Sequence, residues 1–304
     1  MIRALLVAAG MALATPLSAQ VSEDLCRAVF AQATGAIPDA IVEAEIGTDG
    51  ADCVAQGVRI VHGAGRGEIA ADRIAWSGQG LDGFAEEMTP PRALVIEAEG
   101  LSTFALAGQP VFDYVRRARQ AQRKVTLGFE ARWDALTGRL VLDRLEIDFP
   151  GNNRLRLSAR AEGADLTSLP ALLDSVNRIA LTEVTFDVTS NGLFEEVALP
   201  ELAHFVTPTG GDPEASMRAM IGASVAAIEE LPDDMLGGPS KAALIAVIES
   251  LPTPAGALRL TLTLDPPLEV TGALGARLWG TMPLADRLAG FRIGAQYEPT
   301  ADTP

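Results

Sequence analysis

Apolar and charged residues alternate along much of this chain, and the pattern is clearest in residues 138–163. Successive side chains of a β-strand point to opposite faces of the sheet, so strict alternation is typical of a strand with one buried face. The segment therefore predicts two strands joined by a turn at the sequence Pro-Gly-Asn-Asn. The apolar positions on the predicted buried face are Leu145, Ile147, Phe149, Leu155 and Leu157.

The length of the loop sets the register of this hairpin, because residues that are opposite each other share a face. A three-residue loop at 150–152 places apolar residues opposite apolar ones and acidic residues opposite basic ones. The pairs expected from it are Ile147 with Leu155, Leu145 with Leu157, Asp148 with Arg154, and Glu146 with Arg156. A loop at 151–153 also keeps the faces matched, but it leaves Arg144 facing Arg160 and is less favourable.

A second hairpin is predicted around Asn191-Gly192, a dipeptide that favours a two-residue β-turn. Apolar residues occupy even positions before this dipeptide and odd positions after it, so the loop needs an even number of residues. The pairs expected from this loop are Phe186 with Val197 and Val184 with Leu199.

The same reasoning predicts further strands with helices between them. The strands are expected at 40–46, 52–61, 68–76, 92–100, 125–133, 258–264 and 291–297, and the helices at 22–33, 109–124, 213–231 and from about Pro239 onward. Asp212 and Pro213 suit the N-cap and first turn of the third helix. The fold class predicted is α+β, mainly β: a curved antiparallel sheet of hairpins and meanders, with an αα-hairpin and other short helices packed on it.

We expect a single elongated β-rich domain over residues 20–304. The alternative is two similar sub-units at about 36–108 and 124–200, followed by the αα-hairpin and strands of 212–298. That alternative depends on a similarity between GEIAADRI, from Gly67, and GRLVLDRL, from Gly138. Eight residues with three identities are also compatible with chance.

Residues 1–19 have the features of a secretory signal peptide: Arg3, an apolar stretch, and small residues ending at Ala19. The residue directly after this site is Gln20 and not a cysteine, so a bacterial lipoprotein anchor is not expected. No later stretch offers 18 consecutive apolar residues, and a transmembrane segment is not expected in the mature chain. The chain is therefore predicted to be exported to the periplasm as a soluble protein.

The chain contains two cysteines, Cys26 and Cys53. In an oxidising compartment they allow one pairing, and closing the loop between them would stabilise the fold by roughly 3 kcal/mol. A disulfide would join the helix at 22–33 to the strand at 52–61. A redox or metal site is the alternative, but the CxxC spacing and the nearby histidines typical of such sites are missing.

The formal net charge is −16, which disfavours nucleic acid as a partner because an acidic protein repels polyphosphate. One segment, the helix expected at 109–124, concentrates positive charge. One hypothesis is a solvated face paired with the protein's own carboxylates, and the other is contact with an anion or a lipid headgroup. The residues in question are Arg116, Arg117, Arg119, Arg123 and Lys124.

Motifs that would indicate catalysis or cofactor binding are missing from the sequence. GAGRGE, from Gly63, lacks the third glycine of a dinucleotide fingerprint and is interpreted as a turn. His62 and His204 are the only histidines, and a metal site formed by the two is disfavoured. No GxSxG, HExxH or P-loop sequence is present, so we expect a non-enzymatic protein without a cofactor.

The strand, turn and strand of residues 138–163, followed by TSLPALLD, resemble segments of the AsmA-like proteins and related uncharacterised envelope proteins of Gram-negative bacteria. The similarity extends in style over residues 66–270 and includes the later helical pair and GALRLTLTLDPPLEV. It implies a long curved sheet linked to lipid transport or outer-membrane homeostasis. The chain departs from that group because it is short and has no membrane anchor, so the resemblance does not carry a membrane-bridging role.

Three hypotheses about function follow. The first is a periplasmic protein that holds a lipid or another hydrophobic molecule on the apolar face of residues 145–157, with the αα-hairpin as a lid; the alternative for that face is a core covered by helices. The second is a structural or interaction module whose sheet edge or acidic surface docks another envelope protein. The third, a hydrolase, requires a carboxylate pair or a histidine in a cleft.

Overall fold

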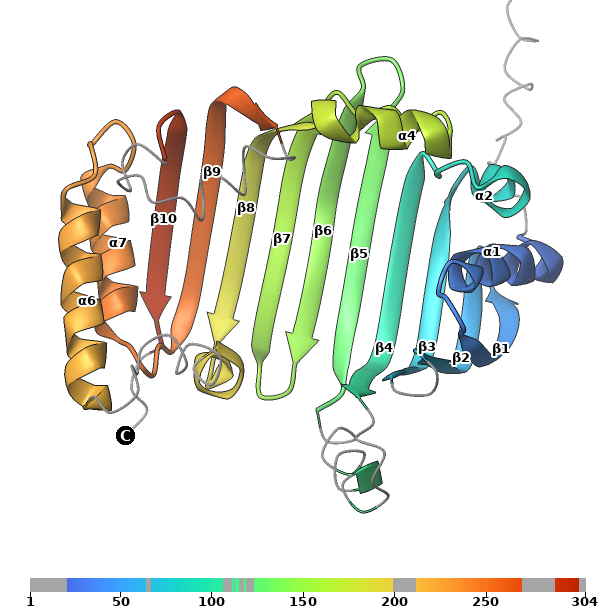
Figure 1. The fold of residues 1–304 in the computed structure, drawn as a ribbon, viewed down its shortest axis with the longest axis horizontal. Helices are drawn as coiled ribbons and strands as arrows, with labels where there is room; N and C mark the ends of the chain where they lie inside the picture. The colour runs from blue at the N-terminus through green and yellow to red at the C-terminus, as the bar shows by residue number, and fades with distance from the viewer. Residues whose placement is uncertain are drawn as a thin grey trace, which may run out of the picture.

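The protein folds around one open antiparallel sheet of ten strands, and the strands follow one another across the sheet in chain order (Figure 1). The computed structural model describes residues 21–63, 67–105, 123–198, 212–269 and 288–300, together with 111, 113, 114 and 118. The strands are β1 (Ile41–Asp49), β2 (Asp52–His62), β3 (Gly67–Gln79), β4 (Ala93–Ala105), β5 (Val125–Asp134), β6 (Arg139–Phe149), β7 (Asn153–Glu162), β8 (Ala180–Ser190), β9 (Gly256–Glu269) and β10 (Phe291–Pro299).

The helices lie mainly at the two edges and at the strand ends (Figure 1). They are α1 (Glu23–Gly35), α2 (Leu81–Glu87), α4 (Leu169–Ser175), α6 (Pro213–Glu229) and α7 (Gly238–Glu249), with the short turns η1 (Val176–Arg178) and η2 (Phe194–Ala198). The predicted class, α+β and mainly β, is confirmed. None of the helices in the described residues is long and apolar enough to cross a membrane.

The hairpin of β6 and β7 has the predicted register. Ile147 pairs with Leu155 and Leu145 with Leu157, while on the other face Asp148 and Glu146 pair with the arginines expected of them. Asn152 takes a positive φ of 60° in the turn, a conformation that asparagine tolerates better than most residues. The meander from Val125 to Ala161 is likewise confirmed as β5, β6 and β7.

The second predicted hairpin is wrong. Phe186 and Val184 pair with Leu260 and Leu262 of β9 instead of residues 197 and 199. Residues 194–198 form the helical turn η2. Asn191 does not close a two-residue turn: its N–H donates to Asn153 Oδ1 at 2.5 Å, and its side chain donates to the Gly151 carbonyl at 3.1 Å. The asparagine thus joins the end of β8 to the β6–β7 loop, and the alternating leucines of β9 supply the apolar partners.

The helix termini follow the sequence signals. The Ser22 hydroxyl accepts from the N–H of Leu25 at the start of α1, and the Asp212 carboxylate accepts from that of Glu214 at the start of α6. The αα-hairpin of α6 and α7 is present. α7 packs against β10, so the hairpin lies beside the last strand and does not cover the middle of the sheet as a lid would (Figure 1).

One face of the sheet is apolar and the other is mostly polar, and this difference holds across all the strands. Opposite pairs on one face are apolar, as in Ile96 with Phe129 and Leu157 with Phe186. Pairs on the other face are mostly charged or polar, as in Asp187 with Arg259. The sheet is therefore amphipathic throughout, and what covers each part of the apolar face decides where the core is.

Candidate functional site

One row of side chains crosses the whole apolar face and shows which parts of that face are covered. We call it the central row. Its members are joined by direct cross-strand pairing: Cys53, Trp76, Ile96, Phe129, Leu145, Leu157, Phe186, Leu260 and Ala295. Because all of these residues share one face and one level of the sheet, differences in their exposure report differences in the layer above them.

The N-terminal end of the central row is buried beneath α1 and α2. Cys53 is 0% exposed and Trp76 is 6% exposed. Phe30 of α1 stacks on the Trp76 ring with their centroids 5.9 Å apart. Cys26 of α1 forms the predicted disulfide with Cys53, with a Cα–Cα distance of 5.3 Å. This end of the apolar face is an ordinary core, in which a helical layer closes over the sheet.

The C-terminal end of the row is also covered. Ala295 of β10 is 6% exposed, and its N–H donates to Ser240 Oγ of α7 at 3.0 Å. A small cluster of Leu264, Leu268 and Phe291 is buried nearby. The two ends of the sheet are thus closed by different helices, α1 with α2 at one and α7 at the other.

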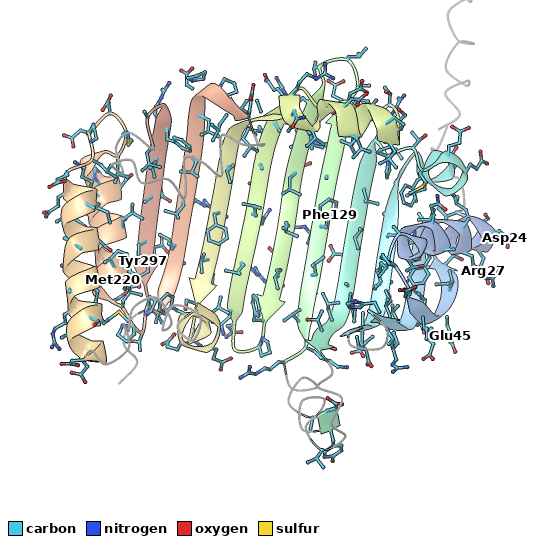
Figure 2. The ribbon with its side chains drawn as sticks, viewed as in Figure 1. Asp24, Arg27, Glu45, Phe129, Met220 and Tyr297 are labelled. Carbon is cyan, nitrogen blue, oxygen red and sulfur yellow. A yellow bond between two sulfur atoms is a disulfide. The ribbon has the colours of Figure 1, made fainter. Side chains whose placement is uncertain are left out.

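Between these ends the apolar side chains stay half-buried. We define the central apolar face as the large apolar residues of β4 to β8 on the central row and on the row beside it, which also includes the buried Ala98 of β4: Ile96, Leu127, Phe129, Leu145, Ile147, Leu155, Leu157, Phe186 and Val188. All nine are intermediate in exposure. Figure 2 shows Phe129 near the middle of the sheet, away from the helices at both edges.

Half-burial here follows from sheet geometry alone. Side chains on adjacent strands lie about 5 Å apart and shield one another's flanks, whereas only a second layer removes the outward surface from water. In the described part of the chain, α1 packs on β1 and β2, α2 packs beside α1 on the same N-terminal cluster, and α7 packs on β10. The central apolar face therefore presents a continuous apolar surface with its outward side uncovered by any described helix.

Two tryptophans flank this surface. The Trp133 ring lies at the β5 end and donates from Nε1 to the Ala164 carbonyl at 3.1 Å, below the segment that leads to α4. At the β3 side, Trp76 Nε1 is buried without a hydrogen-bond partner in the described residues. A buried indole N–H without an acceptor is costly, so Trp76 marks a place where an acceptor would be stabilising.

The opposite face of the same strands is satisfied by ion pairs. Arg144 of β6 crosses over β5 and binds Glu97 of β4, which is possible because Gly128 lies beneath it; a Cβ there would be 2.6 Å from Arg144 Nη1. The hydrogen bond that Arg144 donates to the Glu97 carboxylate raises the pKa of Arg144. Asp187 binds Arg259 at 2.5 Å and raises the pKa of that arginine in the same way. On this face, acidic and basic side chains of neighbouring strands thus pair with each other.

The five residues predicted as the ligand face are brought together. Leu145, Ile147, Leu155 and Leu157 lie side by side on β6 and β7, and Phe149 follows at the end of β6 opposite Asn153. Sequence reasoning did not assign Ile96, Leu127, Phe129, Phe186 and Val188 to the same site. The alternation of apolar and polar residues in β5 and β8 indicates that most of them lie on an apolar face. The order of the strands was needed to show that this face is shared with β6 and β7.

The predicted cationic cluster is only partly described. Arg116, Arg117 and Arg119 lie outside the described residues. Arg123 and Lys124 are exposed, and Lys124 Nζ binds Asp72 at 2.7 Å. Lys124 therefore fits the hypothesis of pairing with the protein's own carboxylates.

Only one of the two histidines considered for a metal site lies in the described part of the chain. His62 is half-buried and lies over Gly67, where a Cβ would be 2.4 Å from the ring, and His204 lies outside the described residues. No group of three or more potential metal ligands occurs among the residues that the structure describes.

Comparisons with protein-family models, with curated proteins and with solved structures returned no match. Function is therefore inferred from the geometry of the sheet.

Proposed function

We propose that this is a non-enzymatic periplasmic protein that binds the acyl chain of a lipid, or another elongated hydrophobic molecule, on the central apolar face. The observation that carries the proposal is the change along the central row, from Trp76 at 6% exposure to a half-buried Phe129 and its neighbours. Large uncovered apolar surfaces are rare on proteins in water and mark binding sites for apolar partners.

The dimensions of the face suit a chain-like ligand. β4 to β8 are five adjacent strands, and at about 4.8 Å per strand they span about 19 Å. The hydrocarbon of one leaflet of a bilayer is about 15 Å thick, so an acyl chain can lie across the strands within the uncovered region. Each methylene removed from water contributes at most about 0.8 kcal/mol, and less on a flat face that contacts one side of the chain.

The proposed compartment has separate support. The disulfide between Cys26 and Cys53 is compatible with export to an oxidising compartment, and residues 1–19 have the features of a signal peptide. The resemblance to AsmA-like proteins, with their link to lipid transport, points in the same direction.

Binding of a fluorescent fatty acid to the purified protein tests the proposal. Leu157→Lys places a charge in the middle of the central apolar face and is expected to weaken binding by about tenfold or more, because the ammonium would have to be desolvated beneath the chain. Ser158→Lys is the matched control. It changes the next residue of β7, which points to the opposite face, and is expected to leave the affinity unchanged.

Native mass spectrometry and lipid extraction of the protein purified from cells complete the test. Co-purification of an acyl lipid with the wild type and with Ser158→Lys, but not with Leu157→Lys, is the expected result. The proposal is wrong if no lipid co-purifies and no fatty acid binds, or if the two lysine variants lose binding equally.

A further inference from the structure

The two edges of the sheet differ in how their backbone groups are used. At β10, the N–H of Ile293 donates to the Met235 carbonyl at 2.8 Å, and Leu236 forms a parallel bridge with Ile293. The connector between α6 and α7 thereby occupies part of that edge. At β1, hydrogen bonds join the strand to β2 on its inner side, and none joins its outer edge to any residue that the structure describes.

The outer edge of β1 is long and regular. The strand has nine residues and, at about 3.4 Å per residue, extends for about 30 Å. It contains neither proline nor lysine, two residues that commonly protect an exposed edge. The one irregularity in its pairing is a bulge in β2, where Gly57 takes a φ of 59°, so β1 itself continues without interruption. α1 packs on the apolar face through Val42, Ala44 and Ile46, and among the described residues no backbone hydrogen bond joins it to the edge of β1.

The charges along β1 are all negative. Glu43, Glu45 and Asp49 share the polar face, and the strand has no Lys or Arg. Arg59 contacts Glu43 at 3.5 Å and Arg73 contacts Asp49 at 3.1 Å, both from the inner side of the sheet. Glu45 makes no ion pair with the described residues, and Figure 2 shows it at the outer margin of the sheet.

A second copy of the chain does not fit this edge. In antiparallel pairing about a two-fold axis, centring the contact on Ala44 places Glu43 opposite Glu45. Centring it on Glu45 places two copies of Glu45 opposite each other, and centring it on Ile46 places Glu43 opposite Asp49. Each register that keeps the apolar faces together and pairs five or more residues of β1 thus opposes like charges, which destabilises a strand pair.

We propose that β1 is a docking edge at which an extended, basic segment of another protein adds as a further strand, with Lys or Arg side chains opposite Glu43 and Glu45 and apolar side chains continuing the face beneath α1. Backbone hydrogen bonds supply the affinity of strand addition, and alternate side chains supply the specificity. The inference is independent of the proposed lipid site, which lies on the face of β4 to β8.

A blocked peptide of alternating lysine and valine, matched in length to β1, tests the proposal with the full protein. We expect salt-sensitive binding and increased protection of the backbone amides of Ile41–Asp49 from hydrogen exchange. Glu45→Lys is expected to weaken binding by about tenfold. Glu298→Lys is the matched control, because this exposed acidic residue lies in β10 at the opposite edge of the sheet. The affinity of this variant for the peptide should equal that of the wild type.

A second peptide separates strand addition from simple charge attraction. N-methylation of alternate residues keeps the charges but removes the backbone donors on one side. Loss of binding by the methylated peptide supports docking at the edge. Equal binding of the two peptides, unchanged exchange in Ile41–Asp49, or a wild-type dimer whose interface maps to β1 would overturn the proposal.

Discussion

Trp76 and Phe129 occupy the same row of the same sheet face, two strands apart, and their environments differ. Trp76 is packed between Phe30 and its neighbours on the sheet, and α1 is tied to that end by a disulfide. Phe129 has apolar neighbours on both flanks, Ile96 and Leu145, but no described helix above it. Both residues lie in strands with the same alternation of apolar and polar residues, so the difference in their burial comes from the helices packed on the sheet.

This contrast shows that an apolar sheet face does not by itself form a hydrophobic core. Cross-strand packing gives each apolar side chain partial burial, and the remaining surface is removed from water only by a covering element. At β1 to β3 the covering helices lie close in sequence to the strands they cover, since α1 precedes β1 and α2 joins β3 to β4. Among the central strands, β5–β6 and β6–β7 are joined by short turns without a helix, and α4, which joins β7 to β8, lies at the strand ends (Figure 1).

Replacing Trp76 by alanine should have the largest effect on stability. Removing a buried aromatic side chain from a closed core costs about 3–5 kcal/mol, because the cavity is only partly refilled. Chemical denaturation followed by circular dichroism measures this loss. If Trp76→Ala costs no more than the same change at Phe129, the covered and uncovered parts of the row do not differ as described.

Removing the disulfide should have the next largest effect, and it should be confined to the covered end. The bond closes a separation of 27 residues, for which the loop-entropy model gives about 3 kcal/mol. The variant Cys26→Ala/Cys53→Ala is expected to exchange amides faster in α1 and β2 than in β5 to β8. A reductant should destabilise the wild type but not this variant. Faster exchange spread evenly over the sheet would contradict a local role.

Phe129→Ala should cost about 1 kcal/mol, because a half-buried side chain has already kept part of its surface in water. The same denaturation measurement applies. Phe129→Lys sharpens the comparison: the lysine chain can lie on the neighbouring side chains with its ammonium in water, whereas Trp76→Lys would bury the charge. Equal and severe losses for the two lysine variants would indicate that the centre is covered as tightly as the end.

Sequence reasoning succeeded where contacts are local. The β6–β7 register follows from the alternation of Leu145 and Ile147 with charged residues and from the short loop that joins the strands. It failed at β8, because the partner of Phe186 is Leu260, which is separated from it by the αα-hairpin. Parity shows which residues share a face, but it does not tell which of several apolar strands supplies the neighbour.

The candidate site, like the fold, could be predicted from the sequence only in part. That Leu145, Ile147, Leu155 and Leu157 form one apolar surface could be read from their spacing. Whether helices cover that surface depends on where α1 and α7 pack, and an apolar helix stripe fits more than one part of an apolar sheet. The disulfide could be assigned to Cys26 and Cys53 because the chain has two cysteines. How deeply the disulfide is buried could not be predicted.

The smallest expected effect comes from Asp165, in the turn between β7 and α4 at the end of the central strands. Its carboxylate accepts from the Thr167 hydroxyl at 2.6 Å and from the Thr167 N–H at 3.0 Å, and these bonds hold its pKa below the ordinary value of 3.8. A lowered pKa contributes stability above the ordinary value that is lost as the pH falls through the lowered one. Asp165→Asn should therefore be slightly less stable than the wild type at neutral pH.

The difference between Asp165→Asn and the wild type should shrink as the pH falls below about 4 toward the lowered pKa of Asp165, because the wild-type carboxylate then becomes protonated as well. The variant without the disulfide is the matched comparison, because the buried residues of the N-terminal cluster include no ionisable side chain. Its stability deficit should stay constant over the same pH range. Unfolding midpoints measured from pH 7 to pH 3 thus distinguish an exposed turn, whose contribution to stability depends on pH, from a closed core, whose contribution does not. A stability deficit of the disulfide variant that changes with pH would mean that ionisable groups help to hold α1 on the sheet.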